Sequence, residues 1–363
     1  MPGVTSVAEI AAAVERLAPL ALAEGWDNCG LQVGDPAARR TRVLVALTPL
    51  PEVFEEAEET GADFLLFHHP LIFTPLRSVD TGSQPGALLA RAVRGDRAVY
   101  ASHTSYDAAP NGVSTTLAAA LGLVGPLRVV SPRGALRKLV VFVPEESVKG
   151  VADALAGAGA GVIGDYTRCT FRTPGTGTFL PGEGSDPYLG ERGHLEKLRE
   201  IRLETVVPTY AARRAADAAT AAHPYEEVAL DVYPVDGYPG ECGYGRVGSL
   251  PEPLTAGELC ERVSDSLGFP ARLVSDPEQG RRIERVAVVG GSGGSFIPEA
   301  ASLGVGAYVS GDLDYHDALL AESLGLAAID AGHAATELPS LEPLARRLAG
   351  LVDVPVGVSQ VRR

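Results

Sequence analysis

The alternation of apolar and polar positions over the first third of the chain predicts short buried strands that alternate with helices. Brief apolar runs are typical of strands buried on both faces, and an apolar residue at every third or fourth position indicates a helix. The predicted helices span 7–17, 52–60, 86–94 and 112–121, and the predicted strands span 43–47, 62–67 and 97–101, after a glycine-punctuated loop and strand at 25–34. This alternation favours an α/β sheet with helices on both faces.

The pattern changes between about 132 and 236, where hairpin strands join the helices. The predicted elements are a strand at 138–143, a helix at 145–156, a polar hairpin segment with a loop at 167–192, a strand at 203–207, a helix at 209–222 and a strand at 228–233. The order βαββαβ is that of a ferredoxin-like plait of α+β class. Linkers near Pro132 and Pro239 are suitable domain boundaries.

The first pattern returns after 240. Helices are predicted at 255–267, 296–303, 314–324 and up to about 348, and strands at 285–289, 307–309, 326–329 and 352–358. We therefore predict one α/β core built from both chain ends, residues 1–131 and 237–363, with the plait inserted at 132–236.

Composition narrows the classes of partner. The formal charge of -15 and the pI near 5.0 argue against a general affinity for nucleic acid or an anionic membrane. No apolar run has the length of a signal peptide core or a membrane span, and the four cysteines show no C-x-x-C spacing. We expect a cytoplasmic protein with reduced thiols. An anionic substrate would need local cations, which a metal centre would supply.

Three clusters of histidine and carboxylate residues carry the candidate chemistry. Each follows a predicted strand: His68-His69-Pro70, His103 to Asp107, and His333 to Glu337. Ligands of open α/β sheets bind at the carboxyl ends of strands, so the three clusters are expected to meet. A spacing of four places His333 and Glu337 on one face of a helix, whereas Pro110 and Asn111 suggest a loop after His103.

These residue types match the ligands of divalent transition metals. A single histidine after a strand is usually a structural residue, but independent structural roles would not require a shared strand-end position. Five or six such ligands exceed what one zinc-like ion takes from a protein, so the clusters predict two metal ions bridged by carboxylates. Zn, Mn, Fe and Ni all remain open as the metal.

The ordered motifs of the chain resemble those of the NIF-three-like family, often labelled GTP cyclohydrolase I type II homologues. The resemblance rests on Gly25-Trp26-Asp27-Asn28-Cys29-Gly30-Leu31, Phe67 to Pro70, His103 to Asp107, Gly245 to Gly248, Gly311-Asp312 with His316, and Asp330 to Glu337. It covers nearly the whole chain, and it implies that the inserted plait is PII-like (CutA-like) and that the core forms a toroidal homohexamer.

The resemblance also assigns site residues. The implied ligands of a dinuclear metal centre are His68, His69, Asp107, His333 and Glu337. His103 matches a position beside the metals, as a ligand or a neighbouring catalytic group. Ser105 departs from the family pattern, in which many members have Asn, and this affects a neighbouring contact and no ligand.

Other segments allow two interpretations each. Asp27-Asn28, beside the only tryptophan, Trp26, either anchors a buried loop or lines the metal cavity. The glycine run 290–294 is either a tight turn or a phosphate contact. His223 to Glu227 either form a polar turn, which we favour, or link the insert to its neighbours or cover the site. The remaining predictions are structural: Asp314 caps a helix, His316 faces away from the metal site, and His194 is solvated.

Two functional hypotheses follow. The first is a two-metal hydrolase acting on a nucleotide-like substrate, with His103 moving protons. The family label implies conversion of GTP to dihydroneopterin triphosphate and formate, although the sequence shows no Lys/Arg cluster for a triphosphate. The alternative is a non-catalytic metal-binding or regulatory ring protein, whose insert senses a small molecule. A nucleic-acid clamp is disfavoured by the net charge.

Overall fold

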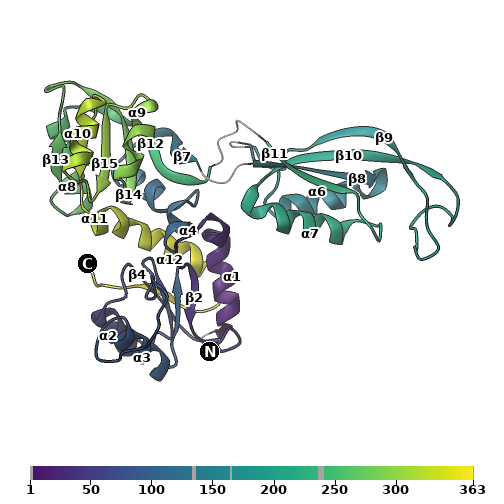
Figure 1. The fold of residues 1–363 in the computed structure, drawn as a ribbon, viewed down its shortest axis with the longest axis horizontal. Coiled ribbons are helices and arrows are strands. Elements are labelled where there is room, and N and C mark those ends of the chain that lie inside the picture. Colours follow the sequence, from purple (N-terminus) through teal and green to yellow (C-terminus); the bar gives the residue numbers. More distant parts are fainter. Residues whose placement is uncertain (1–2, 133–135, 164–165, 236–240, 363) are drawn as a thin grey trace. The chain divides into compact units, whose positions relative to one another are not determined.

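The computed structural model describes residues 3–132, 136–163, 166–235 and 241–362 (Figure 1). Internal contacts divide the chain into a core unit, residues 1–133 and 241–363, and an insert unit, residues 134–240. The sequence placed the corresponding boundaries at 132 and 236, and the expected linker at Pro239 lies outside the described residues. Within the described residues, no helix is both long and apolar enough to cross a bilayer.

The first sheet of the core unit has five strands in the order β17-β4-β5-β6-β2. Its strands are β2 (Gly30–Val33), β4 (Val43–Ala46), β5 (Phe64–Phe67), β6 (Ala98–Ala101) and β17 (Val356–Val358). Four of them run parallel, and β2 is antiparallel to β6. Every residue of β4, β5 and β6 is buried, as expected for parallel strands covered on both faces.

Helices cover both faces of this sheet, which confirms the predicted α/β arrangement. Apolar residues of α1 (Val7–Leu17) and α12 (Leu341–Ala349) pack on one face, and those of α2 (Pro51–Thr60) and α3 (Gly86–Arg94) pack on the other. A capping box between Ser6 and Glu9 starts α1, because each residue satisfies a backbone N–H of the other. The predicted bounds of α1, α2 and α3 agree with the structure to within one residue.

The second sheet of the core unit has six strands in the order β13-β16-β15-β14-β12-β7. Its strands are β7 (Val124–Pro132), β12 (Gly243–Leu254), β13 (Arg272–Ser275), β14 (Ile283–Ser292), β15 (Ala307–Gly311) and β16 (Ala327–Asp330). Its two faces are covered by α5 (Val113–Ala120) with α8 (Ala256–Leu267), and by α9 (Ile297–Ser302) with α10 (Tyr315–Ser323).

Three strands of this sheet, β7, β12 and β13, were not predicted. Glycine and proline interrupt β7, which is tolerated because β7 is an edge strand. The glycine run before Leu250 conceals β12, where Gly245 has a φ of 70° that an L side chain rarely adopts. Sequence periodicity fails here because pairing with β14 and β7, and not residue propensity, makes this segment a strand.

Short helices place the candidate site between the two sheets of the core unit. The first, α4 (Thr104–Asp107), follows β6, and α11 (His333–Glu337) follows β16. The α11 helix contacts β14, β15 and α5. Tyr106 in α4 is fully buried and donates a hydrogen bond of 3.0 Å to the carbonyl of Ser340. The carboxyl ends of strands from both sheets therefore meet, as the sequence predicted.

The insert unit contains a four-stranded antiparallel sheet in the order β11-β8-β10-β9. Its elements are β8 (Leu136–Pro144), α6 (Val148–Gly157), β9 (Phe171–Phe179), β10 (Glu196–Pro208), α7 (Ala212–Ala222) and β11 (Leu230–Pro234). This is the βαββαβ connectivity of ferredoxin-like plaits. Apolar residues of α6 and α7 pack on one face of the sheet, where the two helices lie side by side (Figure 1).

One predicted boundary in the insert is wrong. The sequence predicted a strand only over 203–207, but β10 begins at Glu196. Charged residues flank Leu198 and Ile201 there, so the segment lacks the alternation of apolar and polar residues that indicates a strand. Cross-strand pairing with β9 nevertheless satisfies the backbone and makes this segment part of β10.

Candidate metal centre

His68 and His69 follow β5 and extend its hydrogen bonding by two residues. Their amides donate to the carbonyls of Ala46 and Leu47, so the backbone of both histidines is fixed. The Nδ1 atom of His68 lies 3.0 Å from the carbonyl oxygen of Ser102, which can only accept a hydrogen bond. Nδ1 of His68 therefore carries a proton, and Nε2 faces the site, where it could bind a metal after losing its own proton. Nδ1 of His69 is similarly engaged by the hydroxyl of Thr48, 2.9 Å away.

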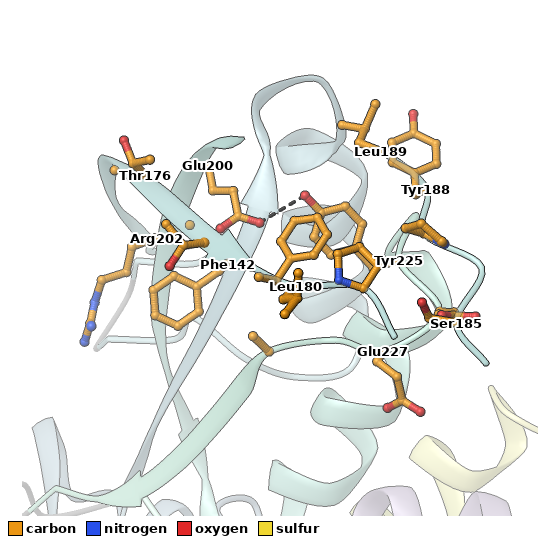
Figure 2. A pocket seen from close by; sticks show the side chains of 18 of the residues that line it. Phe142, Thr176, Leu180, Ser185, Tyr188, Leu189, Glu200, Arg202, Tyr225 and Glu227 are labelled. Carbon is orange, nitrogen blue, oxygen red and sulfur yellow. Dashed lines mark hydrogen bonds between the residues drawn. The ribbon is translucent and has the colours of Figure 1, made fainter. Parts of the chain in front are cut away.

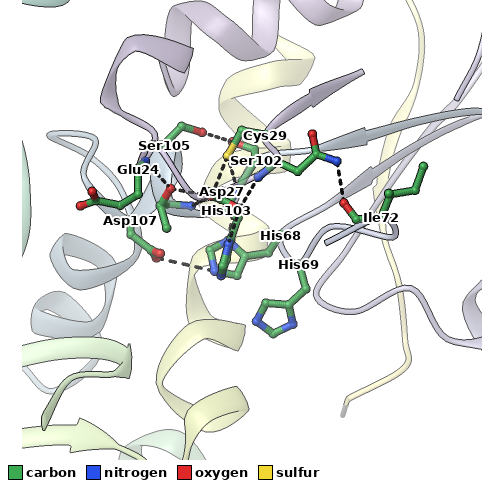
Figure 3. A network of polar contacts seen from close by, with 12 residues as sticks. Glu24, Asp27, Cys29, His68, His69, Ile72, Ser102, His103, Ser105 and Asp107 are labelled. Atoms are coloured by element: carbon green, nitrogen blue, oxygen red, sulfur yellow. Dashed lines mark hydrogen bonds and ion pairs between the residues drawn. The ribbon is translucent and has the colours of Figure 1, made fainter. Parts of the chain in front are cut away.

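His103 and Asp107 lie on a single helical turn, and the expected loop is wrong. The amides of Tyr106 and Asp107 both donate to the carbonyl of His103, so α4 forms despite the nearby Pro110. The turn brings Oδ1 of Asp107 to 3.6 Å from Nε2 of His68. Figure 3 shows these two side chains directed toward each other.

His333 and Glu337 lie on one face of α11, as their spacing predicted. Nε2 of His333 is 3.1 Å from Oε1 of Glu337, and its Nδ1 is 2.7 Å from the carboxylate of Asp312. Glu337 is 2% exposed and extends to the other sheet. Its Oε1 lies 3.4 Å from Nε2 of His68, and its Oε2 lies 3.1 Å from Nε2 of His69.

The structure thus brings together all six side chains that the sequence singled out. Potential ligand atoms lie within 4.8 Å of one another in three groups: His68, His69 and His103; His69, His333 and Glu337; and His68, Asp107 and Glu337. His69 and Glu337 approach closely, but the angle between them does not suit a hydrogen bond.

Unpaired buried atoms test whether these residues fit a metal. Within the described part of the chain, four buried atoms of this cluster have no hydrogen-bond partner: Nε2 of His68, Nε2 of His69, Oδ1 of Asp107 and Oε2 of Glu337. Leaving such atoms unpaired costs about 1–3 kcal/mol each, so buried polar groups are normally satisfied. Imidazole nitrogens and carboxylate oxygens converging without partners are the donor set of a divalent metal. The cluster therefore fits a metal.

Without a metal, the pKa values of the clustered side chains shift in different directions. Burial lowers the pKa of His68, but the carboxylates of Asp107 and Glu337 outweigh it and raise that pKa to about 9. The hydrogen bond with Glu337 likewise raises the pKa of His333 to about 9, despite burial. Burial lowers the pKa of His69 and raises that of Asp107. Glu337 is buried too, yet the surrounding histidines hold its pKa well below its usual range.

Asp27 belongs to this site and orients His103. Its Oδ1 atom accepts from Nδ1 of His103 at 3.0 Å, and the amide of Thr104 donates to its Oδ2 at 3.1 Å. Burial raises the pKa of Asp27, but hydrogen bonds from His103, Thr104 and Cys29 outweigh this and lower it strongly. Asp27 is thus a carboxylate that fixes the tautomer of His103, which favours the cavity-lining interpretation.

The tryptophan beside Asp27 is not a buried anchor. Trp26 is 63% exposed, and Phe73 is 51% exposed. The ring of Trp26 lies 6.0 Å from that of Phe73 and 6.3 Å from that of His103. These two exposed rings form an aromatic rim beside His103.

The glycine run at 290–294 allows close packing against the site. The amides of Gly290 and Gly291 donate to the hydroxyls of Ser114 and Thr336, so neither is available to a phosphate. Gly291 has a φ of 69°, and a Cβ there would lie 2.5 Å from Oε1 of Glu337. These glycines therefore act as a tight turn that lets Glu337 approach.

The other singled-out residues are structural. Asp314 caps α10 as predicted, and His316 is exposed on that helix, outside the metal-ligand groups. His194 is exposed, as expected. The segment from His223 to Glu227 contains the expected turn, in which His223 is buried and its Nε2 lies 2.9 Å from the carbonyl of Phe142.

Arg246, within the motif Gly245 to Gly248, supports the loop after α4. Its buried guanidinium donates to the carbonyls of Ala109 and Pro110 at 3.1 and 3.0 Å. Burial lowers the pKa of Arg246 to about 10, and the surrounding carbonyls compensate for the lost hydration. This contact joins β12 to the segment that carries Asp107.

Sequence reasoning missed the partners of the histidine Nδ1 atoms. They are Thr48, the carbonyl of Ser102 and Asp312. A histidine ligand normally donates its second N–H to a carboxylate, carbonyl or hydroxyl, so a search for strand-end polar residues would have found Thr48 after β4. Asp312 belongs to the motif Gly311-Asp312, but the sequence analysis assigned it no role.

Comparison with known proteins agrees with these features. The family model described as Duf34/NIF3 (NGG1p interacting factor 3) matches residues 5–363. A Bacillus subtilis protein named GTP cyclohydrolase 1 type 2 homolog is 40% identical over 342 residues, covering 93% of this chain and 91% of the relative. A Mycobacterium tuberculosis protein of the same name is 37% identical over 339 residues, covering 92% and 88%. The crystal structure of a Bacillus cereus protein related to NIF3 matches with a TM-score of 0.85 and 39% identity, covering 98% of this chain and 97% of that chain.

Proposed function

The chain belongs to the Duf34/NIF3 family, and from this premise we propose that it is a dinuclear-metal-dependent hydrolase acting on a nucleotide-like substrate. The observation that carries the proposal is the set of four unpaired, buried nitrogen and oxygen atoms at the meeting point of the two core sheets. Such a set requires a compensating ligand, and imidazole with carboxylate suits divalent Zn, Mn, Fe or Ni.

Two ions are proposed because the donor atoms overlap in groups. The residues that would hold the ions are His68, His69, Asp107, His333 and Glu337, and Glu337 would be shared between them. Its two oxygens face different histidines: Oε1 faces His68 and His333, and Oε2 faces His69. When bound, a pair of divalent ions supplies Lewis acidity toward a water molecule and the bond under attack.

His103 is the proposed catalytic proton carrier. Its ring lies 5.3 Å from that of His68 and 5.6 Å from that of His69, between centroids. Asp27 holds the Nδ1 proton, so Nε2 of His103 is the atom that accepts and returns a proton during the reaction. Asp27 is a positioning residue, because it acts through His103.

The aromatic rim supports a flat substrate. Trp26 and Phe73 expose ring surface beside His103, and planar heterocycles stack on such rings. The name of the relatives makes GTP the first substrate to test, with formate and dihydroneopterin triphosphate as products. The glycine run offers little to a triphosphate, since the amides of Gly290 and Gly291 are already used.

Two assembly features complete the proposal. By family resemblance, the core forms a toroidal homohexamer and the insert is a PII-like domain. The βαββαβ connectivity of the insert supports the second of these. The alternative function is a non-catalytic metal-binding or regulatory ring protein, which the same ligand set would also support.

Metal content and turnover separate the two functions. Protein purified without chelators should contain two metal ions per chain by elemental analysis. A hydrolase should release formate from GTP or product from another heterocyclic nucleotide, and His103→Ala should abolish turnover while retaining metal. Asp27→Asn should lower kcat by about 10–100-fold with unchanged metal content, because His103 loses its orienting carboxylate.

A matched control is His316→Ala, which removes an exposed histidine outside the cluster. It should leave metal content and turnover unchanged. Two metals without turnover on any nucleotide tested would favour the regulatory alternative. Fewer than one metal per chain after reconstitution with Zn, Mn, Fe and Ni would contradict both.

A further inference from the structure

The insert unit contains a cavity of about 630 Å³, separate from the residues of the metal centre. Its floor is the sheet face opposite α6 and α7. Val141 and Leu203 pack under the helices, so their chain neighbours Phe142 and Arg202 point to the other face, where they are paired across β8 and β10. Phe142, Glu200 and Arg202 line the cavity.

Two glycines of β9 form part of one wall of the cavity and leave space beside Glu200. Gly175 lies opposite Glu200 in the antiparallel pair, and a Cβ there would meet no atom within 4 Å. A Cβ at Gly177 would overlap the carboxylate of Glu200, so only glycine lets this carboxylate lie against the strand. Glu200 is thereby held at the cavity wall.

Aromatic and apolar side chains close the cavity from the opposite side. The segment after β9 carries Leu180 and Tyr188, and the turn after α7 carries Tyr225. The rings of Tyr188 and Tyr225 lie 6.1 Å apart, and the amide of Asp186 donates to Glu226 at 2.8 Å. The hydroxyl of Tyr225 donates to Oε1 of Glu200 at 3.0 Å (Figure 2).

The charge of the lining is negative. Glu200, Glu226 and Glu227 line the cavity, against the single cation Arg202. Nε of Arg202 donates to Glu204 at 2.6 Å, and Lys138 contacts the same carboxylate at 3.0 Å. Burial and the carboxylate of Glu200 raise the pKa of Tyr225, which keeps the phenol protonated. An anion such as a phosphate would meet three carboxylates and only one cation among these lining residues.

We propose that this cavity binds an organic cation with a flat or apolar body, of the arylalkylammonium or quaternary ammonium class. Glu200 faces the charge, and the rings of Phe142, Tyr188 and Tyr225 surround the body. Aromatic faces attract cations, and the guanidinium carbon of Arg202 already lies 5.7 Å from the centroid of the Phe142 ring. The volume lies within the range of about 300–1,000 Å³ that is usual for small-molecule sites.

Three probes that share an indole ring test the charge preference on the full chain. Tryptamine is a cation, tryptophol is neutral, and indole-3-acetate is an anion; benzyltrimethylammonium extends the test to a quaternary nitrogen. By calorimetry, at least one of the two cations should bind saturably, and tryptamine should bind about tenfold more tightly than tryptophol, a difference of about 1.4 kcal/mol. Indole-3-acetate should bind most weakly.

Variants locate the binding. Glu200→Gln keeps an acceptor for Tyr225 but removes the charge, so it should abolish the preference for cations. Gly175→Val should block the cavity in an intact strand, and it provides a second test if Glu200→Gln is unstable. Glu252→Gln, an exposed carboxylate of the core unit, is the matched control and should change nothing.

Three results would overturn the proposal. They are the absence of saturable binding by both cations, equal affinity for the three indoles, and cation binding that persists in both Glu200→Gln and Gly175→Val. Metal content and turnover are measured separately on the same variants and should stay at wild-type values, so failure of this proposal and failure of the hydrolase proposal are distinguishable.

Discussion

The metal centre of the core unit and the cavity of the insert unit differ in which of their surfaces lack a partner. In the metal centre, buried polar atoms such as Nε2 of His68 and Oδ1 of Asp107 have no hydrogen-bond partner within the described residues, so the cluster could hold a metal ion. In the insert cavity, the carboxylate of Glu200 is already hydrogen-bonded, and exposed apolar surface such as that of Leu180 lacks cover. Buried polar atoms without partners indicate a charged ligand, and exposed apolar area indicates a ligand with an apolar body.

The difference also concerns rigidity. The ligands of the metal centre lie within hydrogen-bonding distance of other groups and follow fully buried strands, so their geometry is set before any metal arrives. The insert cavity is formed by a glycine-containing strand and a long connecting segment. Substitutions should therefore have large and specific effects in the core, and mild effects on folding in the insert.

The largest expected effect comes from Glu337→Gln. The change keeps the shape but removes the charge of the one carboxylate that faces three histidines. Metal affinity should fall by more than ~100-fold, beyond the loss expected for residues that only support a ligand. Elemental analysis after dialysis against buffered metal measures this, and cation binding by the insert should be unaffected. Retention of two metals would refute the bridging role.

Asp312→Asn should have a smaller effect on the same centre. Asp312 has a φ of 53°, which Asn also tolerates, so the backbone is not strained. The loss of the carboxylate beside Nδ1 of His333 should weaken metal binding by about tenfold. Competition with a chromophoric chelator would show it, with Asp314→Asn as a control that still caps α10. Unchanged affinity would mean that Asp312 is only a surface partner.

The stability of the metal-free protein should depend on pH through its histidines. Nearby carboxylates raise the pKa of His68 and His333 to about 9 in the folded state, above the ordinary value of 6.5. The resulting stabilisation is fully present below pH 6.5 and is lost as the pH rises through about 9. The metal-free protein should therefore melt at a lower temperature at pH 9 than at pH 6.5.

Metal-loaded protein should behave differently over the same range. Its histidines must be neutral to bind metal, so rising pH strengthens binding and offsets the loss. Thermal melts with and without a chelator at several pH values test this. A metal-free protein that becomes more stable toward pH 9 would contradict the assignment of protons to His68 and His333.

The smallest effects come from a matched pair of glycine substitutions. Gly291→Ala places a methyl group 2.5 Å from Oε1 of Glu337 at a φ of 69°, so we expect a loss of about 1–2 kcal/mol and weaker metal binding. Gly175→Ala meets no atom within 4 Å and should leave stability within about 0.5–1 kcal/mol, if anything raising it. Denaturant unfolding compares them, and equal effects would remove the distinction between the two regions.

Much of the fold could be predicted because local rules and tertiary structure agree. Helices such as α1 and α8 carry apolar spacing and capping boxes, and buried strands such as β5 are uninterrupted apolar runs. The rule that parallel strands present ligands at their carboxyl ends placed His68, His103 and His333 together. The failures included β7, β12 and the start of β10, where strand pairing overrides glycine, proline or charge. The strand β13 and the helical turn α4 were also missed.

The sequence by itself determined the ligand types, the positions of the clusters at strand ends, and the pairing of His333 with Glu337 across one helical turn. Those features depend on chemistry and short-range spacing, which the order of residues contains directly. Only the tertiary structure decided which atoms face the site. Asp27 orients His103, Gly291 admits Glu337, and Glu200 meets Tyr225 because distant segments pack together. Such contacts depend on the packing of whole sheets and helices, and local sequence patterns do not encode that geometry.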